Sequence, residues 1–166
     1  MSSSRAWYLV YTKPRAEIRA NENLLRQGYK TYLPTIHVEV KRQGNYIKRT
    51  DAFFPRYLFV NLDQVSDNWG PIRSTIGVTE IIRFGGLPVS VPEKVIDLLK
   101  LNEIESGSQK IKKKSLTKGD SVNIISGPFE GLHGIFQQTK SAERVSVLLD
   151  IVGINTQVSL NMNQLR

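Results

Sequence analysis

The stretch from Leu116 to Phe136 constrains the fold more than any other part of this chain, because turn-forming residues recur inside apolar runs. Val122 and Ile124 alternate with polar residues as in a half-buried strand, and Gly127-Pro128 follows at once. Glycine and proline at such points impose tight turns between short strands. The pattern predicts a small β-barrel at the C-terminal end of the chain. Its expected strands cover residues 118–126, 132–138, 143–151 and 154–160.

The N-terminal part alternates strands and helices. Strands are expected at 7–11, 29–40, 56–62 and 78–84, helices at 15–27, 67–74 and 92–101, and a hairpin tip at 43–45. This order predicts an α+β fold in which helices cover one face of an antiparallel sheet. Residues 102–115 are rich in Ser, Gly and Lys, as in a solvated linker. We therefore expect an N-terminal domain at 1–101, a linker at 102–115 and a C-terminal domain at 116–166.

Several classes of function are disfavoured by what the sequence lacks. There is no cysteine, and neither His37 nor His133 has the acidic or serine neighbours of a catalytic relay. No P-loop, HExxH or GxSxG motif occurs, and no run of 18 apolar residues or apolar signal core is present. We expect a monomeric, cytoplasmic protein that is not an enzyme and uses no metal, no cofactor and no membrane.

The positive charge is unevenly distributed. The chain carries a net charge of +8, of which +6 lies in residues 1–100 and none in residues 115–166. A basic N-terminal part indicates a polyanion partner, whereas a neutral C-terminal part favours a protein partner. The alternative is that the charge serves only solubility, and charge alone does not decide between the two.

A ridge of arginines is expected on the helix at 15–27. At about 100° per residue, Arg15, Arg19 and Arg26 fall within roughly a 40° arc. Such a ridge suits phosphate groups, and nearby polar side chains suit bases or sugars. The alternative is a plain solvated helix face. The neighbouring polar residues are Lys13, Asn23 and Gln27.

Aromatic residues form a second group. Period-two alternation sends Tyr57 and Phe59 to one face of their strand. Helices on the other face of the sheet would leave these aromatics partly open to a partner, together with Tyr11 and Phe54. The alternative is an ordinary core, which we prefer for Trp7 and Phe53.

Motifs spread along the chain are similar to those of the NusG family of transcription elongation factors. They read WYLVY at 7–11, FPRYLFV at 54–60, GV at 77–78 with RFG at 83–85, and GPFEG at 127–131. The last of these resembles the KOW domain of the family. Four motifs in the family's order cover nearly the whole chain. Details at 72–75, 82–85 and 91–92 look more like the specialised antiterminator branch, the RfaH proteins.

The resemblance implies partners. In the family, an apolar cavity binds the clamp helices of the RNA polymerase β′ subunit and suppresses pausing, and the specialised branch also contacts the non-template DNA strand. The matching polymerase-binding residues are Tyr11, Phe54, Pro55, Phe59 and Phe84. The matching DNA-binding residues are Lys13, Asn23, Arg26, Gln27, Arg73 and Thr75, to which the ridge adds Arg15 and Arg19.

The resemblance also implies contacts of the C-terminal domain. The KOW domain contacts a small-subunit ribosomal protein, or Rho in housekeeping members, and Ile151 and Val152 are candidates here. The specialised branch stores this domain as a helical hairpin over the polymerase site, for which Asp51 and Arg144 would form the interdomain pair. Further interdomain candidates are Phe136 and Leu148.

Two features depart from the specialised branch. A His-Thr-rich loop that grips the β subunit is replaced by SDNWGP at 66–71, which puts that contact in doubt. Interior glycines such as Gly134 and Gly153 oppose a helix by roughly 1 kcal/mol each, and Val145 and Val147 favour strands. We therefore expect a β-barrel as at least one accessible state, with the helical state as a hypothesis.

Two further functions remain open. One is a housekeeping factor that links polymerase to Rho or the ribosome without a DNA element. The other is a KOW-containing RNA- or ribosome-binding protein, which the neutral C-terminal part disfavours.

Overall fold

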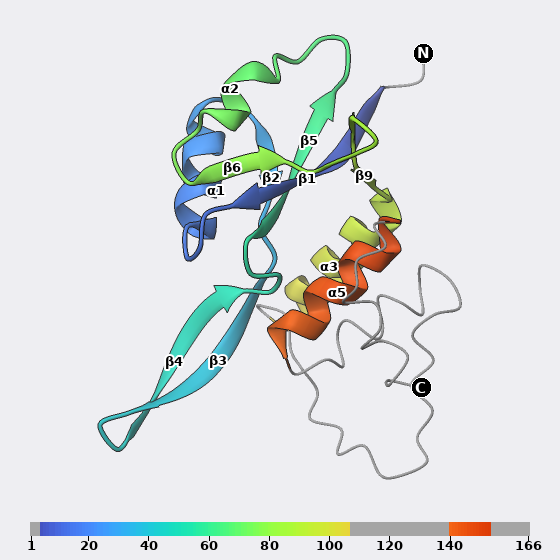
Figure 1. Ribbon diagram of the computed structural model, residues 1–166. Helices are drawn as coiled ribbons and strands as arrows, with labels where there is room; N and C mark the ends of the chain where they lie inside the picture. Colours follow the sequence, from blue (N-terminus) through green and yellow to red (C-terminus); the bar gives the residue numbers. More distant parts are fainter. Residues whose placement is uncertain (1–3, 107–139, 154–166) are drawn as a thin grey trace, which may run out of the picture.

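A computed structural model describes residues 4–106 and 140–153 (Figure 1). Its centre is an antiparallel sheet with strand order β2-β5-β1-β6, and β9 also pairs with β1. β1 is therefore an inner strand, as its apolar sequence requires. The strands of the sheet are β1 (Arg5–Thr12), β2 (Lys30–Tyr32), β5 (Tyr57–Asp63), β6 (Val78–Ile81) and β9 (Ser90–Val91).

Alternation along β1 and β5 divides the core into two parts. Leu9 lies opposite Phe59 and Val10 lies opposite Leu58 in the pairing of the two strands. Because successive side chains point to opposite faces of a sheet, the first pair belongs to one core and the second pair to the other. All four side chains are completely buried.

The core beside Leu58 is covered by two helices. Ala20 and Leu24 from the first helix and Ile72 from the second pack against the sheet there. Gly77 approaches the first helix so closely that an added Cβ would lie 3.0 Å from Ala20, and its φ of +97° suits glycine alone. The two helices are α1 (Glu17–Arg26) and α2 (Gly70–Arg73).

The core beside Phe59, which we call the aromatic-side core, is covered by two other helices that run next to each other (Figure 1). They are α3 (Glu93–Ser106) and α5 (Ser141–Ile151). The Glu103 carboxylate of α3 accepts hydrogen bonds from the Tyr32 and Thr35 hydroxyls, which ties this helix to the sheet. The buried members contributed by the helices are Val95, Ile96, Leu99, Val147, Leu148 and Leu149.

Two hairpins lie outside the sheet. The long one joins β3 (Thr35–Arg42) to β4 (Asn45–Ala52) and extends away from the rest of the described chain (Figure 1). The short one joins β7 (Arg83–Phe84) to β8 (Leu87–Pro88).

The predicted α+β architecture is confirmed for the N-terminal part, with three corrections. Helices cover both faces of the sheet, so the expected open aromatic face is wrong. The expected strand at 143–151 is wrong, because this segment is helix α5. Helix α3 continues to Ser106, past the expected start of the linker at 102. The other expected strands of the C-terminal domain lie outside the described residues.

Local sequence permits helix α5 despite its β-branched residues. Residues 141–151 contain neither glycine nor proline, and the helix ends just before Gly153, whose φ is +85°. A left-handed glycine at this position is a common helix stop, and the Gly153 amide donates to the Asp150 carbonyl. Packing on the aromatic-side core then outweighs the strand preference of Val145 and Val147.

Candidate functional site

Phe54 and Phe59, at the centre of the expected polymerase-binding residues, lie inside the aromatic-side core. Both side chains are completely buried. Their rings meet edge to face with centroids 6.1 Å apart, and Phe53 meets Phe54 in the same manner at 4.8 Å. Tyr32 stacks on Phe59 at 6.2 Å. The aromatic residues thus form one continuous layer on the sheet.

Helix α5 is part of what covers this layer. Val147 and Leu148 are completely buried and Leu149 is 8% exposed, all within the aromatic-side core. The two candidates for a ribosome contact, Ile151 and Val152, are half-buried against the same core. Phe136 lies outside the described residues. The C-terminal segment therefore uses its apolar face against the aromatic layer in this structure.

Arg144 fixes the start of α5 to the hairpin side of this layer. Its Nε donates to the Phe53 carbonyl oxygen at 2.7 Å, and its guanidinium lies 4.8 Å from the centre of the Phe53 ring. Burial lowers the pKa of Arg144, while the Asp51 and Glu143 carboxylates act in the opposite direction. Arg144 is only 4% exposed, so hydrogen bonds within the protein must take the place of the hydrogen bonds with water that it loses on burial.

Asp51, the expected partner of Arg144, is engaged by a residue of its own strand. Arg49 donates to the two Asp51 carboxylate oxygens at 2.7 and 2.8 Å. Asp51 and Arg144 line the same pocket of about 520 Å³, between the base of the β3–β4 hairpin and α5. The Asp51 carboxylate thus forms its ion pair with Arg49 and acts on Arg144 through its charge.

The remaining candidates for polymerase binding are more accessible. Tyr11 is half-buried at the end of β1, where its ring packs on Tyr57 at 5.1 Å and the Arg56 guanidinium lies 4.1 Å from its centre. Burial raises the pKa of Tyr57, and Tyr11 adds to the effect. Pro55 is half-buried, and Phe84 is 65% exposed on the β7–β8 hairpin.

Polar side chains expected to bind DNA come together where α1 meets the loop after α2. Gln27 Nε2 donates to Thr75 Oγ1 at 2.8 Å, and Asn23 Nδ2 donates to the Ile76 carbonyl at 3.1 Å. Thr75 Oγ1 in turn donates to the Pro71 carbonyl at 2.8 Å. The basic candidates Lys13, Arg19, Arg26 and Arg73 are all exposed. Arg15 is exposed too, but it precedes α1 with a φ of +59° and lines the pocket beside Asp51 and Arg144. The expected ridge of three arginines on one helix is therefore wrong for Arg15.

Thr75 differs from the other polar members, because it is 6% exposed and both its donor and acceptor roles are used inside the protein. Thr75 therefore holds the Gln27 side chain in position through this hydrogen bond. The structure therefore joins the helix and the loop into one polar surface, which we call the α1 surface, and this surface carries a basic rim.

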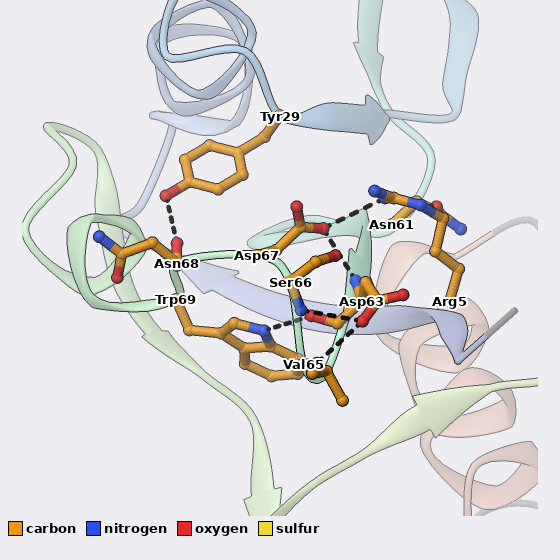
Figure 2. Close-up of polar contacts among 9 residues, drawn as sticks. All are labelled: Arg5, Tyr29, Asn61, Asp63, Val65, Ser66, Asp67, Asn68 and Trp69. Carbon is orange, nitrogen blue, oxygen red and sulfur yellow. Dashed lines mark hydrogen bonds and ion pairs between the residues drawn. The ribbon is translucent and has the colours of Figure 1, made fainter.

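Figure 2 shows a hydrogen-bonded loop that sequence reasoning did not single out. The Asp63 carboxylate accepts from the Val65 and Ser66 amides at 2.8 and 3.0 Å, and these bonds lower the pKa of Asp63 to about 2. Asp67 accepts from the Asp63 amide and forms an ion pair with Arg5 at 3.2 Å. An aspartate that caps its own turn is the signal that marks such loops.

Two aromatic residues close this loop. Trp69 Nε1 donates to the Asp63 carbonyl at 3.1 Å, and the Tyr29 hydroxyl donates to the Asn68 carbonyl at 2.7 Å (Figure 2). The Trp69 ring also meets Tyr8 edge to face at 4.6 Å. This is the segment in which the sequence departs from the specialised branch, and here its polar groups are largely used to hold its own shape.

Within residues 4–106 and 140–153, no group of three or more His, Cys, Asp or Glu side chains is placed to hold a metal ion. No helix in these ranges is long and apolar enough to cross a membrane.

The sheet domain carries an aromatic layer that helix α5 covers, and a polar surface with a basic rim. These features are typical of a protein that binds other macromolecules. Residues 5–100 match the family model described as "Transcription termination factor nusG". The chain belongs to the NusG family, whose members are non-enzymatic transcription factors.

Curated relatives align with nearly the full length of the chain. It is 26% identical to the transcription termination/antitermination protein NusG of Rickettsia typhi, covering 98% of this chain and 90% of that protein. It is 27% identical to NusG of Deinococcus radiodurans, covering 95% and 96%. A solved structure of Thermotoga maritima NusG aligns over 75% of both chains with a TM-score of 0.42 and 26% identity. The relatives named here support a NusG-type termination/antitermination factor, and thus the housekeeping alternative more than the RfaH branch.

Proposed function

We propose that this protein is a transcription elongation factor that binds RNA polymerase through the aromatic layer centred on Phe54 and Phe59, and that helix α5 masks this layer until it is displaced. Tyr11, Pro55 and Phe84 extend the binding surface around the layer. The observation that carries the proposal is that α5 packs its buried leucines onto these aromatics.

Because helix α5 covers the aromatic layer, we expect the partner that replaces it also to present a helix. An isolated helix of 11 residues is marginal in water, so α5 depends on its apolar face for stability. A surface that holds one amphipathic helix is suited to hold another, by the helix-in-groove mode of recognition. This supports the family's known target, the clamp helices of the β′ subunit, as the ligand that replaces α5.

The α1 surface supplies the DNA contact in this proposal. Arg26 and Arg73 bind phosphates of the non-template strand, while Asn23 and Gln27 contact bases or sugars. Because Gln27 is held by Thr75, its amide is positioned before DNA arrives. Single-stranded bases exposed in a transcription bubble offer edges that such amides recognise.

The specialised and housekeeping forms of this function differ in two respects. The specialised form needs both unmasking and a DNA element, and the docked α5 favours it. The housekeeping form needs neither, and the NusG names of the relatives favour it. In both forms the C-terminal domain binds a small-subunit ribosomal protein, or Rho, through residues that include Ile151 and Val152.

In vitro transcription with purified bacterial RNA polymerase tests the proposal. Phe84→Ala removes an exposed aromatic from the binding surface, and Tyr46→Ala, an aromatic that is 72% exposed on the separate β3–β4 hairpin, is its matched control. Pause suppression that falls with Phe84→Ala and not with Tyr46→Ala is the expected result. Equal activity of all three proteins contradicts polymerase binding at this surface.

The DNA contact is tested on templates that differ only in the non-template strand of the bubble. Loss of activity on one template with Arg26→Gln supports the specialised form. Activity that is the same on every template and insensitive to Arg26→Gln supports the housekeeping form.

A further inference from the structure

The pocket beside Asp51 and Arg144 lies where three parts of the chain meet. Residues at the start of α1, at the base of the β3–β4 hairpin and at the start of α5 all line it. Its volume of about 520 Å³ is within the range of pockets that bind small molecules. The functions considered so far concern macromolecules and leave this pocket without a role.

The charged side chains of the pocket favour an anion. Three arginines and two carboxylates line it, which gives a net charge of +1. Both carboxylates already have partners inside the protein. Asp51 forms its ion pair with Arg49, and Glu17 accepts a hydrogen bond from the Arg56 amide at 2.9 Å. The charge that remains uncompensated is therefore positive.

Arg15 carries this uncompensated charge. Its side chain lines the pocket, is exposed, and forms neither an ion pair nor a hydrogen bond within the described residues. Its φ of +59° is uncommon for a residue other than glycine, and such conformations recur at functional sites. A guanidinium presents a planar fork of donors that matches the oxygens of a carboxylate or a phosphate.

The rest of the wall is suited to an apolar group. Ile18, Val38 and Pro55 line the pocket and are each at least partly accessible. An inorganic ion would leave these side chains in contact with water, whereas a ligand with an apolar body would cover them. Ser141, at the start of α5, adds a hydroxyl, and no side chain caps the first amides of this helix, which further favours an anion.

We propose that this pocket binds a small organic anion. A phosphate or carboxylate group of the ligand is held by Arg15 and Ser141, and an apolar body lies against Ile18, Val38 and Pro55. Because Ser141 and Arg144 belong to α5, the site is complete only while this helix is docked. The ligand therefore stabilises the docked form of α5.

Under the proposed function, the same ligand would keep α5 over the aromatic layer and oppose polymerase binding. That consequence rests on the proposed function, whereas binding of the anion does not. The two are separated by measuring ligand binding in the absence of polymerase.

Isothermal titration calorimetry of the full chain tests the inference with four probes. 1-Naphthyl phosphate and 1-naphthoate share an aromatic body and differ in the anionic group, so the tighter of the two identifies the preferred group. 1-Naphthol supplies the body without the charge, and inorganic phosphate supplies the charge without the body. At least one naphthyl anion should bind about 10-fold or more tightly than both of these, since a hydrogen bond to a charged group contributes about this factor.

Two variants alter the pocket in different ways. Arg15→Gln removes the uncompensated cation, and Ile18→Glu places a carboxylate on the apolar wall. A carboxylate in the first turn of α1 is compatible with the helix, so the second variant should remain folded. Each should weaken binding of the naphthyl anion by about 10-fold or more. Equal melting temperatures of wild type and variants establish that the folds are intact.

Arg42→Gln is the matched control. Arg42 is exposed on β3, does not line the pocket and, like Arg15, forms no ion pair within the described residues. The substitution removes the same charge and should leave the Kd for the naphthyl anion unchanged. An equal loss of affinity in Arg15→Gln and Arg42→Gln would show that only the total charge matters and would overturn the inference.

Amide hydrogen exchange tests the link to α5. At a ligand concentration of 100 times Kd, the ratio of docked to released α5 should rise by about 100-fold, and exchange in α5 should slow by up to that factor. The inference is also overturned if neither naphthyl anion binds more tightly than 1-naphthol, or if exchange in α5 is the same with and without saturating ligand. Neither result bears on polymerase binding, which is measured by Phe84→Ala.

Discussion

Leu148→Ala should release helix α5 from the aromatic layer. The Leu148 side chain is completely buried among aromatic and aliphatic residues of the sheet and α3. Replacing a buried leucine by alanine costs about 2–5 kcal/mol, from lost burial and the cavity that remains. Because α5 is held mainly by this face, most of the cost should fall on docking of the helix and little on the sheet.

The lower end of that range predicts a large effect on binding. A loss of about 2 kcal/mol shifts the equilibrium between docked and released α5 by roughly 30-fold. As long as the docked form predominates, the apparent affinity for polymerase rises by the same factor, because affinity is reduced by the fraction of binding-competent protein. Full-chain protein titrated onto purified polymerase measures this factor.

Leu25→Ala is the matched control. It removes the same atoms from a leucine of α1 that is 50% exposed and should leave the affinity unchanged. Amide hydrogen exchange provides a second measurement, in which Leu148→Ala should speed exchange in α5 and leave exchange in β1 and β5 as in the wild type. The reasoning is refuted if Leu148→Ala and Leu25→Ala have equal affinity for polymerase and equal exchange in α5.

Three further outcomes are expected. Arg49→Gln should strengthen docking of α5, because Asp51 is then available to Arg144, and exchange in α5 should slow. Hydrogen bonds lower the pKa of Asp63 to about 2, so the stability that its carboxylate contributes is present above about pH 4 and is lost as the pH falls toward 2. The difference in melting temperature between wild type and Asp63→Ala should therefore shrink over that range. Gly77→Ala should lower the unfolding free energy by roughly 1–3 kcal/mol in denaturant titrations, because of its positive φ and its contact with α1.

The sheet domain could be predicted because its signals are local. The apolar run at 7–11 is β1, the run at 56–62 is β5, and the arginine-bearing helix is α1. The single strand expected at 29–40 is instead two strands, β2 and β3, which are separated at Pro34, because proline has no amide hydrogen to donate to a ladder. In each case the residues that specify the element lie within it.

Helix α5 could not be predicted in the same way, because its specification is not local. Val145 and Val147 favour a strand, and the contacts that outweigh them come from Phe54 and Phe59, almost a hundred residues earlier in the chain. The Asp63 loop was missed for a different reason. Its turn is local, but its closure by Tyr29 and Arg5 depends on three separate segments.

Because α5 belongs to the same chain as the surface that it covers, it acts as a competitor that dilution cannot remove. Tethered ligands of this kind experience effective concentrations on the order of millimolar. A free partner at micromolar concentration must therefore bind far more tightly than α5 does, or must arrive with a second point of attachment. A factor built in this way would ignore most of the polymerase in a cell and respond where two contacts are offered together.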